Sequence, residues 1–260
     1  MLNNLFEEWC EHRHINVADG RKLYLLKEKD GARPTIEKKL DDTVASHYEE
    51  PKRLADCIAR RGYVKAAQLL NEMLPQTKKA RSGDLGEILA TEAVSAFLNP
   101  FQIPIKRLRW RDGRESAMRG EDLIGIAQEH GRVRFLKGES KSRSNLTPSV
   151  LIEARKALKT NDGRPTQHTM GFVMNRLLDQ GQEDLALVFE DYMLIKTIAL
   201  QDLIHLIFTL SGNNASVNLE SDLRNCDDSI EQHSIALCIP DHQNFIASIY
   251  ERLKNYAPQR

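Results

Sequence analysis

The sequence predicts an α/β fold in which a helix precedes three strands and a second helix, and a later strand and helix end the chain. Three patterns predict it: two strand-like runs with a short break in residues 119–141, small and apolar residues at helical spacing in residues 82–98, and an apolar run, residues 234–239, that stops at Pro240. The chain has 260 residues, 41% hydrophobic and 28% charged, which suits a globular protein with a sizeable core.

The amino-terminal part, residues 1–78, is expected to be a helical lobe. Helices are predicted over residues 51–60 and 63–74, and Pro75 ends the second of them. A short extended piece, residues 22–26, is expected to lead into a loop. A further helical pattern opens the chain, carried by Leu2, Leu5, Phe6 and Trp9.

Residues 82–98 are predicted to form a helix that begins at Ser82. Glycine inside a helix costs about 1 kcal/mol relative to alanine, so two glycines indicate a need for close packing. Glu87, one position after Gly86, is then expected to face the edge of a sheet. The alternative is that Glu87 is an ordinary exposed acid on the helix. The stripe of small residues consists of Gly83, Gly86, Ala90 and Ala93.

Three strands are expected next. Residues 103–110 are predicted to form the first, followed by a turn at Asp112-Gly113, and residues 119–141 to form a hairpin that turns at residues 129–131. Successive strand residues point to opposite faces, so Glu139 and Lys141 are expected on one face. Antiparallel pairing would bring the carboxylate of Asp122 beside that of Glu139.

Two carboxylates and an ammonium at one end of a sheet have two interpretations. Adjacent carboxylates repel one another and are tolerated mainly around a cation, and hard oxygen ligands suit Mg²⁺ or Mn²⁺. A lysine beside such ligands can orient a metal-bound water. The alternative is a solvated hairpin end, because the tripeptide Glu-x-Lys is common.

The rest of the chain is predicted to be mainly helical up to its last strand. Thr147-Pro148 marks the start of one helix, since proline is favoured at the first helical position. A helical insertion is expected at about residues 164–231, before the strand at residues 234–239. Its helices are predicted over residues 170–178, 185–192 and 200–210, and a last helix over residues 242–256.

Charge is unevenly distributed although the net charge is zero. Residues 181–240 are strongly acidic, whereas a basic segment lies just before the carboxylates. Such a segment attracts phosphate backbones irrespective of their sequence. Charges that protect a strand edge are the alternative. The basic segment comprises Lys106, Arg107, Arg109, Arg111, Arg114 and Arg119.

Several classes of protein are disfavoured. No apolar run is long enough to span a membrane and the first residues lack the apolar stretch of a signal peptide, so we expect a cytoplasmic protein. The segment Glu11-His-Arg-His14 lacks a further metal-ligating partner and is interpreted as a surface turn. The four cysteines are scattered, which indicates reduced thiols: Cys10, Cys57, Cys226 and Cys238.

The predicted order of elements, with Glu87 on the first helix, Asp122 on the second strand and Glu139-Ser-Lys141 on the third, resembles the PD-(D/E)xK nuclease superfamily. Glu121 stands where that pattern usually has proline. The resemblance implies a restriction-endonuclease-like αβββαβ core in residues 79–260. We expect the amino-terminal lobe, residues 1–78, the acidic region, residues 181–240, or both to dock a partner protein.

More narrowly, two segments are similar to HamA, the nuclease subunit family of Hachiman anti-phage systems. They are Gly83-Asp-Leu-Gly-Glu-Ile-Leu-Ala-Thr91 and Arg119-Gly-Glu-Asp-Leu-Ile-Gly125. This resemblance implies a DNA endonuclease that acts with a helicase resembling HamB. A non-catalytic adaptor of the same fold and a stand-alone restriction-type endonuclease remain as alternatives.

The resemblance also implies roles for individual residues. Asp122, Glu139 and the backbone carbonyl of Ser140 would hold a divalent metal ion. Glu87 would complete the metal shell or help to hold a second ion. Lys141 would position the attacking water and offset charge on the phosphate.

Overall fold

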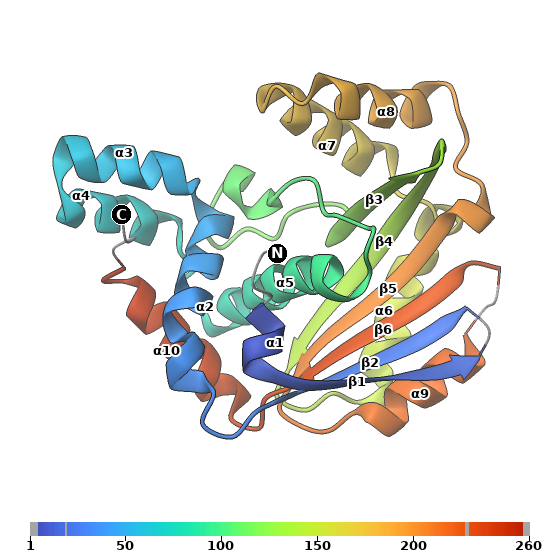
Figure 1. The fold of residues 1–260 in the computed structure, drawn as a ribbon, viewed down its shortest axis with the longest axis horizontal. Coiled ribbons are helices and arrows are strands. Elements are labelled where there is room, and N and C mark those ends of the chain that lie inside the picture. The colour runs from blue at the N-terminus through green and yellow to red at the C-terminus, as the bar shows by residue number, and fades with distance from the viewer. Residues whose placement is uncertain (1–4, 19, 227–228, 257–260) are drawn as a thin grey trace.

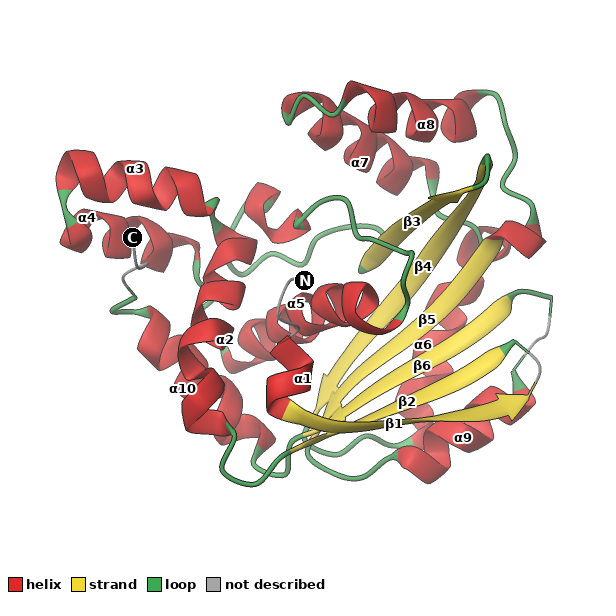
Figure 2. Cartoon of the chain, in the orientation of Figure 1, coloured by secondary structure: helices red, strands yellow, loops and turns green. Residues whose placement is uncertain are grey.

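The computed structural model describes residues 5–18, 20–226 and 229–256. Its fold is mixed α/β, with a six-stranded sheet in the order β1-β2-β6-β5-β4-β3 and helices on both faces (Figures 1 and 2). The strands are β1 (Cys10–Ala18), β2 (Arg21–Glu28), β3 (Leu123–Glu129), β4 (Arg132–Arg143), β5 (Leu203–Ser211) and β6 (Glu231–Cys238). The α/β prediction is confirmed, whereas the restriction-endonuclease-like topology stays a proposal.

Ten α-helices lie in the described residues, together with short 3-10 turns. The amino-terminal helices are α1 (Leu5–Trp9), α2 (Arg33–Tyr48), α3 (Pro51–Arg61), α4 (Tyr63–Met73) and α5 (Lys78–Phe97). The later helices are α6 (Pro148–Lys159), α7 (Gln167–Asp179), α8 (Glu183–Leu194), α9 (Ser216–Asn225) and α10 (His242–Leu253). No helix in this part of the chain combines the length and apolarity needed to cross a membrane.

The centre of the sheet is parallel and its two edges are antiparallel hairpins. Strands β2, β6, β5 and β4 run parallel to one another. The edge strands β1 and β3 run antiparallel to β2 and β4 respectively. A central parallel strand is covered on both faces, and every residue of β5 is buried. This burial explains why the predicted helix over residues 200–210 is wrong, since a continuous apolar run does not distinguish a buried strand from a buried helix.

The predicted helical lobe over residues 1–78 is also wrong in part. Strands β1 and β2, residues 10–18 and 21–28, pair as a hairpin that belongs to the same sheet as β3 to β6. Most of β1 is exposed on this sheet edge, so its residues lack the apolar alternation that would indicate a strand. The predictions of α3, α4 and the extended piece at residues 22–26 are confirmed, but α2 was not predicted.

Around the hairpin of β3 and β4 most predictions are confirmed. The hairpin turns at residues 130–131, and α6 begins at Pro148 after Thr147 as expected. The predicted strand over residues 103–110 is wrong, because only an isolated bridge at Gln102 and a 3-10 turn, Arg107–Trp110, form there. Helix α5 starts one turn earlier than predicted: the hydroxyl of Thr77 accepts a hydrogen bond from the backbone N–H of Ala80.

The two faces of the sheet have separate apolar cores. Helices α5 and α10 pack on one face, where Leu136 and Phe208 meet Leu85 and Ile249. Helices α6 and α9 pack on the opposite face (Figure 1). A third cluster joins α7 and α8 to the end of the sheet formed by β3, β4 and β5. Because β5 lies between α8 and α9, residues 164–231 are not a helical insertion.

Helix α5 packs closely on β4 at Gly86, as the small-residue stripe predicts. A Cβ atom on Gly86 would lie 2.9 Å from Ser140 Oγ and 3.2 Å from Ser142 Cβ, whereas one on Gly83 would meet nothing within 4 Å. The close approach therefore depends on Gly86 and not on Gly83. It places the next residue, Glu87, near the hairpin.

We predict opposite effects on stability for Gly83→Ala and Gly86→Ala. Gly83→Ala should raise the free energy of unfolding by up to about 1 kcal/mol, because alanine is the better helix former. Gly86→Ala should lower it by about 1 kcal/mol or more, because crowding against β4 outweighs that gain. Urea unfolding of both variants measures the difference, and equal stabilisation would show that α5 does not need its glycine at β4.

Candidate functional site

The predicted site residues meet where the hairpin of β3 and β4 lies beneath α5. Asp122 immediately precedes β3, and its Oδ2 accepts a hydrogen bond of 2.9 Å from the backbone N–H of Ser140. This bond places Asp122 beside Glu139, the preceding residue of β4. Glu87 reaches the same place from α5, because the neighbouring Gly86 packs against Ser140.

Burial raises the pKa values of all three carboxylic acids, and repulsion by Asp122 adds to the effect at Glu87 and Glu139. For Glu87, burial and then the charge of Asp122 raise the pKa to about 8. The same two causes raise the pKa of Glu139 to about 7, against the opposing effect of Lys141. Burial also raises the pKa of Asp122, although its hydrogen bond from Ser140 opposes this. Three carboxylates in such surroundings gain stability from a nearby cation.

The ammonium of Lys141 is one such cation. Its Nζ lies 2.8 Å from Glu139 Oε1 and 3.1 Å from Glu153 Oε1. Burial disfavours the charged form, but these two partners outweigh it and raise the pKa of Lys141. Glu153 comes from α6 and was not predicted as part of the site, because no sequence spacing links a helix to the strand it packs on.

Glu87 is held less completely than the other two acids. Its Oε2 atom is buried without a hydrogen bond and lies 3.8 Å from Nε of Arg107. A buried carboxylate oxygen without a donor is costly unless a cation or water satisfies it. Glu87 therefore retains an oxygen that is available to a metal ion.

The donor set fits Mg²⁺, which binds through one or two carboxylates and keeps several waters. Asp122, Glu139 and the carbonyl of Ser140 would supply such a set, with Glu87 near them. Within the described residues, no three His, Cys, Asp or Glu side chains are already gathered as a metal-binding group. Glu139 would have to exchange part of its contact with Lys141 for a metal ion.

Most of the predicted DNA-binding segment is engaged inside the protein. Lys106 pairs with Glu92, and Arg109 with Glu50. Arg111 pairs with Asp84. The guanidinium of Arg107 donates to the backbone carbonyl of Glu121 and lies near Glu87. Two members of the segment are exposed, Arg114 and Arg119.

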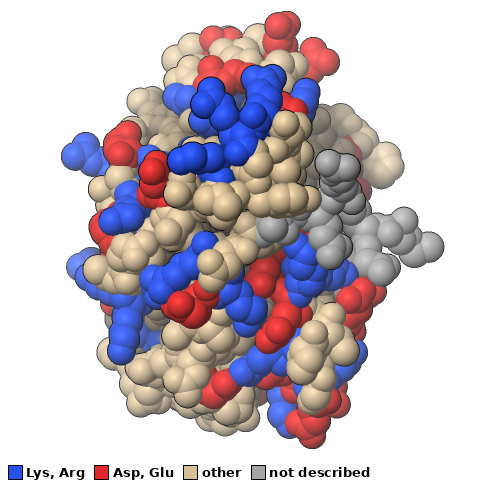
Figure 3. All heavy atoms as spheres, turned by 90° about the vertical axis from the view of Figure 1, so that its left-hand side faces the viewer, with Lys and Arg blue, Asp and Glu red and all other residues tan. Residues whose placement is uncertain are grey.

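One face of the molecule carries charges of both signs. The face on the side of α3 and α4 mixes basic and acidic side chains (Figure 3). Neutral overall charge is consistent with this mixture.

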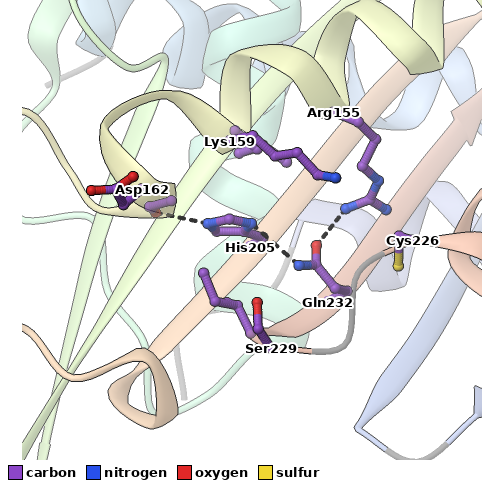
Figure 4. A pocket seen from close by; sticks show the side chains of 10 residues that line it. Arg155, Lys159, Asp162, His205, Cys226, Ser229 and Gln232 are labelled. Carbon is purple, nitrogen blue, oxygen red and sulfur yellow. Dashed lines mark hydrogen bonds between the residues drawn. The ribbon is translucent and has the colours of Figure 1, made fainter.

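A separate cavity of about 270 Å³ lies on the face of the sheet covered by α6 (Figure 4). The guanidinium of Arg155 donates to Asp222 and to Gln232 Oε1, and the ring of His205 contacts Gln232 on one side and the carbonyl of Gly163 on the other. His205 is thus a buried, hydrogen-bonded residue of the core. The predicted site residues do not line this cavity.

Comparison with known proteins agrees with the narrower resemblance. A sequence model of the HamA family matches residues 3–253. The chain is also similar to the Hachiman protein HamA of Bacillus cereus, with 24% identity over 256 residues. That similarity covers 96% of this chain and 91% of the relative.

We predict that Arg111 stabilises the fold whereas Arg114 does not. Arg111→Met should lower the free energy of unfolding by about 3 kcal/mol, because it leaves the carboxylate of Asp84 buried without its counter-ion. Arg114→Met, the control, should change stability by less than about 0.5 kcal/mol, because Arg114 is exposed. Denaturant unfolding of the two variants tests this, and similar stabilities would mean that the Arg111–Asp84 pair adds nothing.

Proposed function

The chain belongs to the HamA family, and on that premise we propose that it is the metal-dependent DNA endonuclease of a Hachiman anti-phage defence complex. The observation that carries the proposal is the meeting of three partly buried acids, Glu87, Asp122 and Glu139, with Lys141 at one end of the β3–β4 hairpin. Acids whose pKa values are raised together are typical of sites that bind cations or perform acid-base chemistry.

The proposed reaction is hydrolysis of a phosphodiester bond. A water oxygen forms a bond to phosphorus, the bond from phosphorus to one ester oxygen breaks, and the leaving oxygen takes up a proton. Asp122, Glu139 and the Ser140 carbonyl would hold Mg²⁺ or Mn²⁺, which supplies Lewis-acid stabilisation when bound. Lys141 would orient the water and offset negative charge on the phosphate.

Glu153 adds a constraint on Lys141 in this scheme. Its carboxylate holds Nζ of Lys141 on the side of α6, so the ammonium is already ordered before DNA binds. An ordered ammonium loses less conformational entropy when it engages a phosphate. The exposed arginines, Arg114 and Arg119, would contact the DNA backbone.

The same contacts support one competing function. Because Lys141 is shared between Glu139 and Glu153, its charge is already neutralised. This observation favours a non-catalytic adaptor that binds a partner or DNA. The four side chains that a nuclease requires are all present and close together, however, and they favour catalysis. A cleavage assay decides between the two.

We further propose that a helicase partner resembling HamB restrains and supplies the nuclease. A nuclease that tolerates many sequences would damage the host genome if it were unrestrained. The family premise and the absence of any assigned DNA-reading motif in the sequence support control by a partner. A stand-alone restriction-type endonuclease would instead cleave at its own recognition sequence without a partner.

The proposed function is tested first by substituting the proposed catalytic residues. Asp122→Ala, Glu139→Ala and Lys141→Ala should each lower the rate of Mg²⁺-dependent DNA cleavage at least about 100-fold. The free energies of unfolding of the two carboxylate variants should lie within about 1 kcal/mol of that of the parent, because each substitution relieves repulsion between carboxylates. Plasmid and single-stranded DNA, each with and without Mg²⁺, are the substrates.

A matched control is Glu129→Ala, which removes an exposed acid at the other end of the same hairpin. It should cleave DNA like the parent. Calorimetric titration with Mn²⁺ adds a readout independent of cleavage, and Asp122→Ala should bind the ion weakly. Full activity in Glu139→Ala would refute the assignment of the site, and a parent that binds DNA without cleaving it would favour the adaptor.

The second prediction concerns the exposed arginines. If Arg114 and Arg119 each contact a phosphate of duplex DNA, replacing both by alanine should reduce the slope of log affinity against log salt by about 1.8, or about 0.9 for each contact. The control removes Arg60 and Arg61, which are exposed on α3. Fluorescence anisotropy at several salt concentrations measures the slopes. Equal slopes in both double variants would exclude these contacts.

A further inference from the structure

The hairpin of α7 and α8 has no part in the site described above. It projects beyond the end of the sheet formed by β3 and β4 (Figure 1). Its inner face is apolar: the ring of Phe135 on β4 packs against Phe189 and Tyr192 of α8. The beginning of α7 is held to the rest of the protein by polar contacts, and these contacts lie next to the proposed metal site.

Glu121 joins the start of α7 to Asp122, the next residue in the chain. The carboxylate of Glu121 accepts two hydrogen bonds of 3.0 Å from Thr166, one from its backbone N–H and one from its hydroxyl. The backbone N–H of Glu121 donates to Thr169 Oγ1 at 3.4 Å. Thr166 is the N-cap of α7, so a negative charge here is also favoured by the helix dipole.

Lys137 supplies a second attachment at the same place. Its side chain is only 1% exposed, and Nζ lies 3.5 Å from Glu121 Oε1. The ammonium also donates to the carbonyl oxygens of Thr160 and Arg164, at 2.8 and 3.0 Å. His205 contacts the carbonyl of Gly163 at 2.8 Å (Figure 4). Buried polar groups therefore fix the segment that leads into α7 to strands β4 and β5.

The backbone at Gly120 packs tightly against the start of α7. Gly120 has a φ of +91°, and a Cβ atom there would clash with Thr169 Oγ1 of α7. Buried hydrogen bonds and ion pairs are costly to break without a replacement. A displacement of the start of α7 must therefore move Glu121, and Asp122 with it.

The outer surface of α8 is suited to a partner. Leu187 and Leu194 are 56% and 68% exposed and lie seven residues apart, so they share one face of the helix. Ile195, just beyond the helix, is 79% exposed. Glu183 and Glu190 lie on the same stripe, four residues before and three after Leu187.

The acids on this stripe restrict the kind of partner. Negative charge repels nucleic acid and anionic lipid surfaces. The remaining class of large partner is a protein whose contact surface is apolar and flanked by lysine or arginine, because complementary charges favour the encounter.

We infer that the α7–α8 hairpin is an arm on which a basic, partly apolar protein surface docks, and that the Glu121–Lys137 pair transmits the position of this arm to Asp122. The inference rests on the proposed function, in which the helicase partner is that protein. It adds where the helicase docks and how docking alters the metal site.

Docking of the partner on α8 is tested by reversing the charges of the helix. Glu183→Lys with Glu190→Lys should weaken binding of the purified helicase partner about tenfold or more, because like charges then face each other. Asp56→Lys with Glu72→Lys is the matched control, since it makes the same change on exposed positions of α3 and α4. The control should bind within about twofold of the parent, as expected for charges distant from an interface.

Biolayer interferometry of the parent and both double variants measures these affinities. Weakening in the control and not in the α8 variant would overturn the inference and place the partner on the α3–α4 hairpin. A parent that cleaves DNA with Mg²⁺ but never binds the helicase would overturn both the inference and the proposed partnership, while leaving the proposed nuclease intact.

Transmission from the α7–α8 hairpin to Asp122 can be followed at the backbone amide of Ser140, because this amide donates a hydrogen bond to Asp122. In the parent, helicase binding should change the hydrogen-exchange rate of this amide about threefold or more. Glu121→Gln should bind the helicase normally yet show little change at Ser140. Thr166→Val is a second variant, which removes the hydroxyl bonds of Thr166 to the Glu121 carboxylate and to Thr169, including the N-cap of α7, and keeps the Lys137 pair.

Circular dichroism shows whether each variant is folded, and if Glu121→Gln is not, Thr166→Val decides. A reduced response at Ser140 in a folded variant that still binds supports transmission through Glu121. An unchanged response in that variant, or no response in the parent, would overturn it.

Discussion

The close packing of α5 on β4 is the constraint on which the rest of the site depends. It requires Gly86, since any side chain there would meet Ser140 and Ser142. Packing at this distance brings Glu87 to the hairpin that carries Asp122 and Glu139, and it buries acids that repel one another. The raised pKa values of Glu87 and Glu139 follow from that burial. The fold thus creates a demand for positive charge at this one place.

The protein meets part of that demand with its own cations. Lys141 lies between Glu139 and Glu153, Arg107 approaches Glu87, and Arg111 neutralises Asp84 one turn away on α5. A basic segment in the sequence is therefore largely a set of internal counter-ions in the structure. A zero net charge does not exclude a nucleic-acid partner, because the relevant quantity is the local charge around the site.

Buried polar groups connect this site to the periphery. Lys137 on β4 and His205 on β5 are paired residues of adjacent strands, and both bond to the segment that precedes α7. Glu121 completes the connection beside Asp122. Polar groups buried in this way fix a single arrangement, since each loses its partner if its neighbour moves. The proposed docking arm acts on the site through this connection.

The sequence alone determined the local features: the β3–β4 hairpin, the helices after Pro51 and Pro148, and the strand alternation that puts Glu139 and Lys141 together. These depend on periodicity and on residues near in the chain. Only the tertiary structure decided that β1 and β2 join the sheet through pairing of β2 with β6, that residues 203–211 are a central strand, and that Glu153 and Arg107 reach the acids. Strand pairing and ion pairs between distant segments depend on packing, and a buried apolar run such as β5 has the same composition whether it is a strand or a helix.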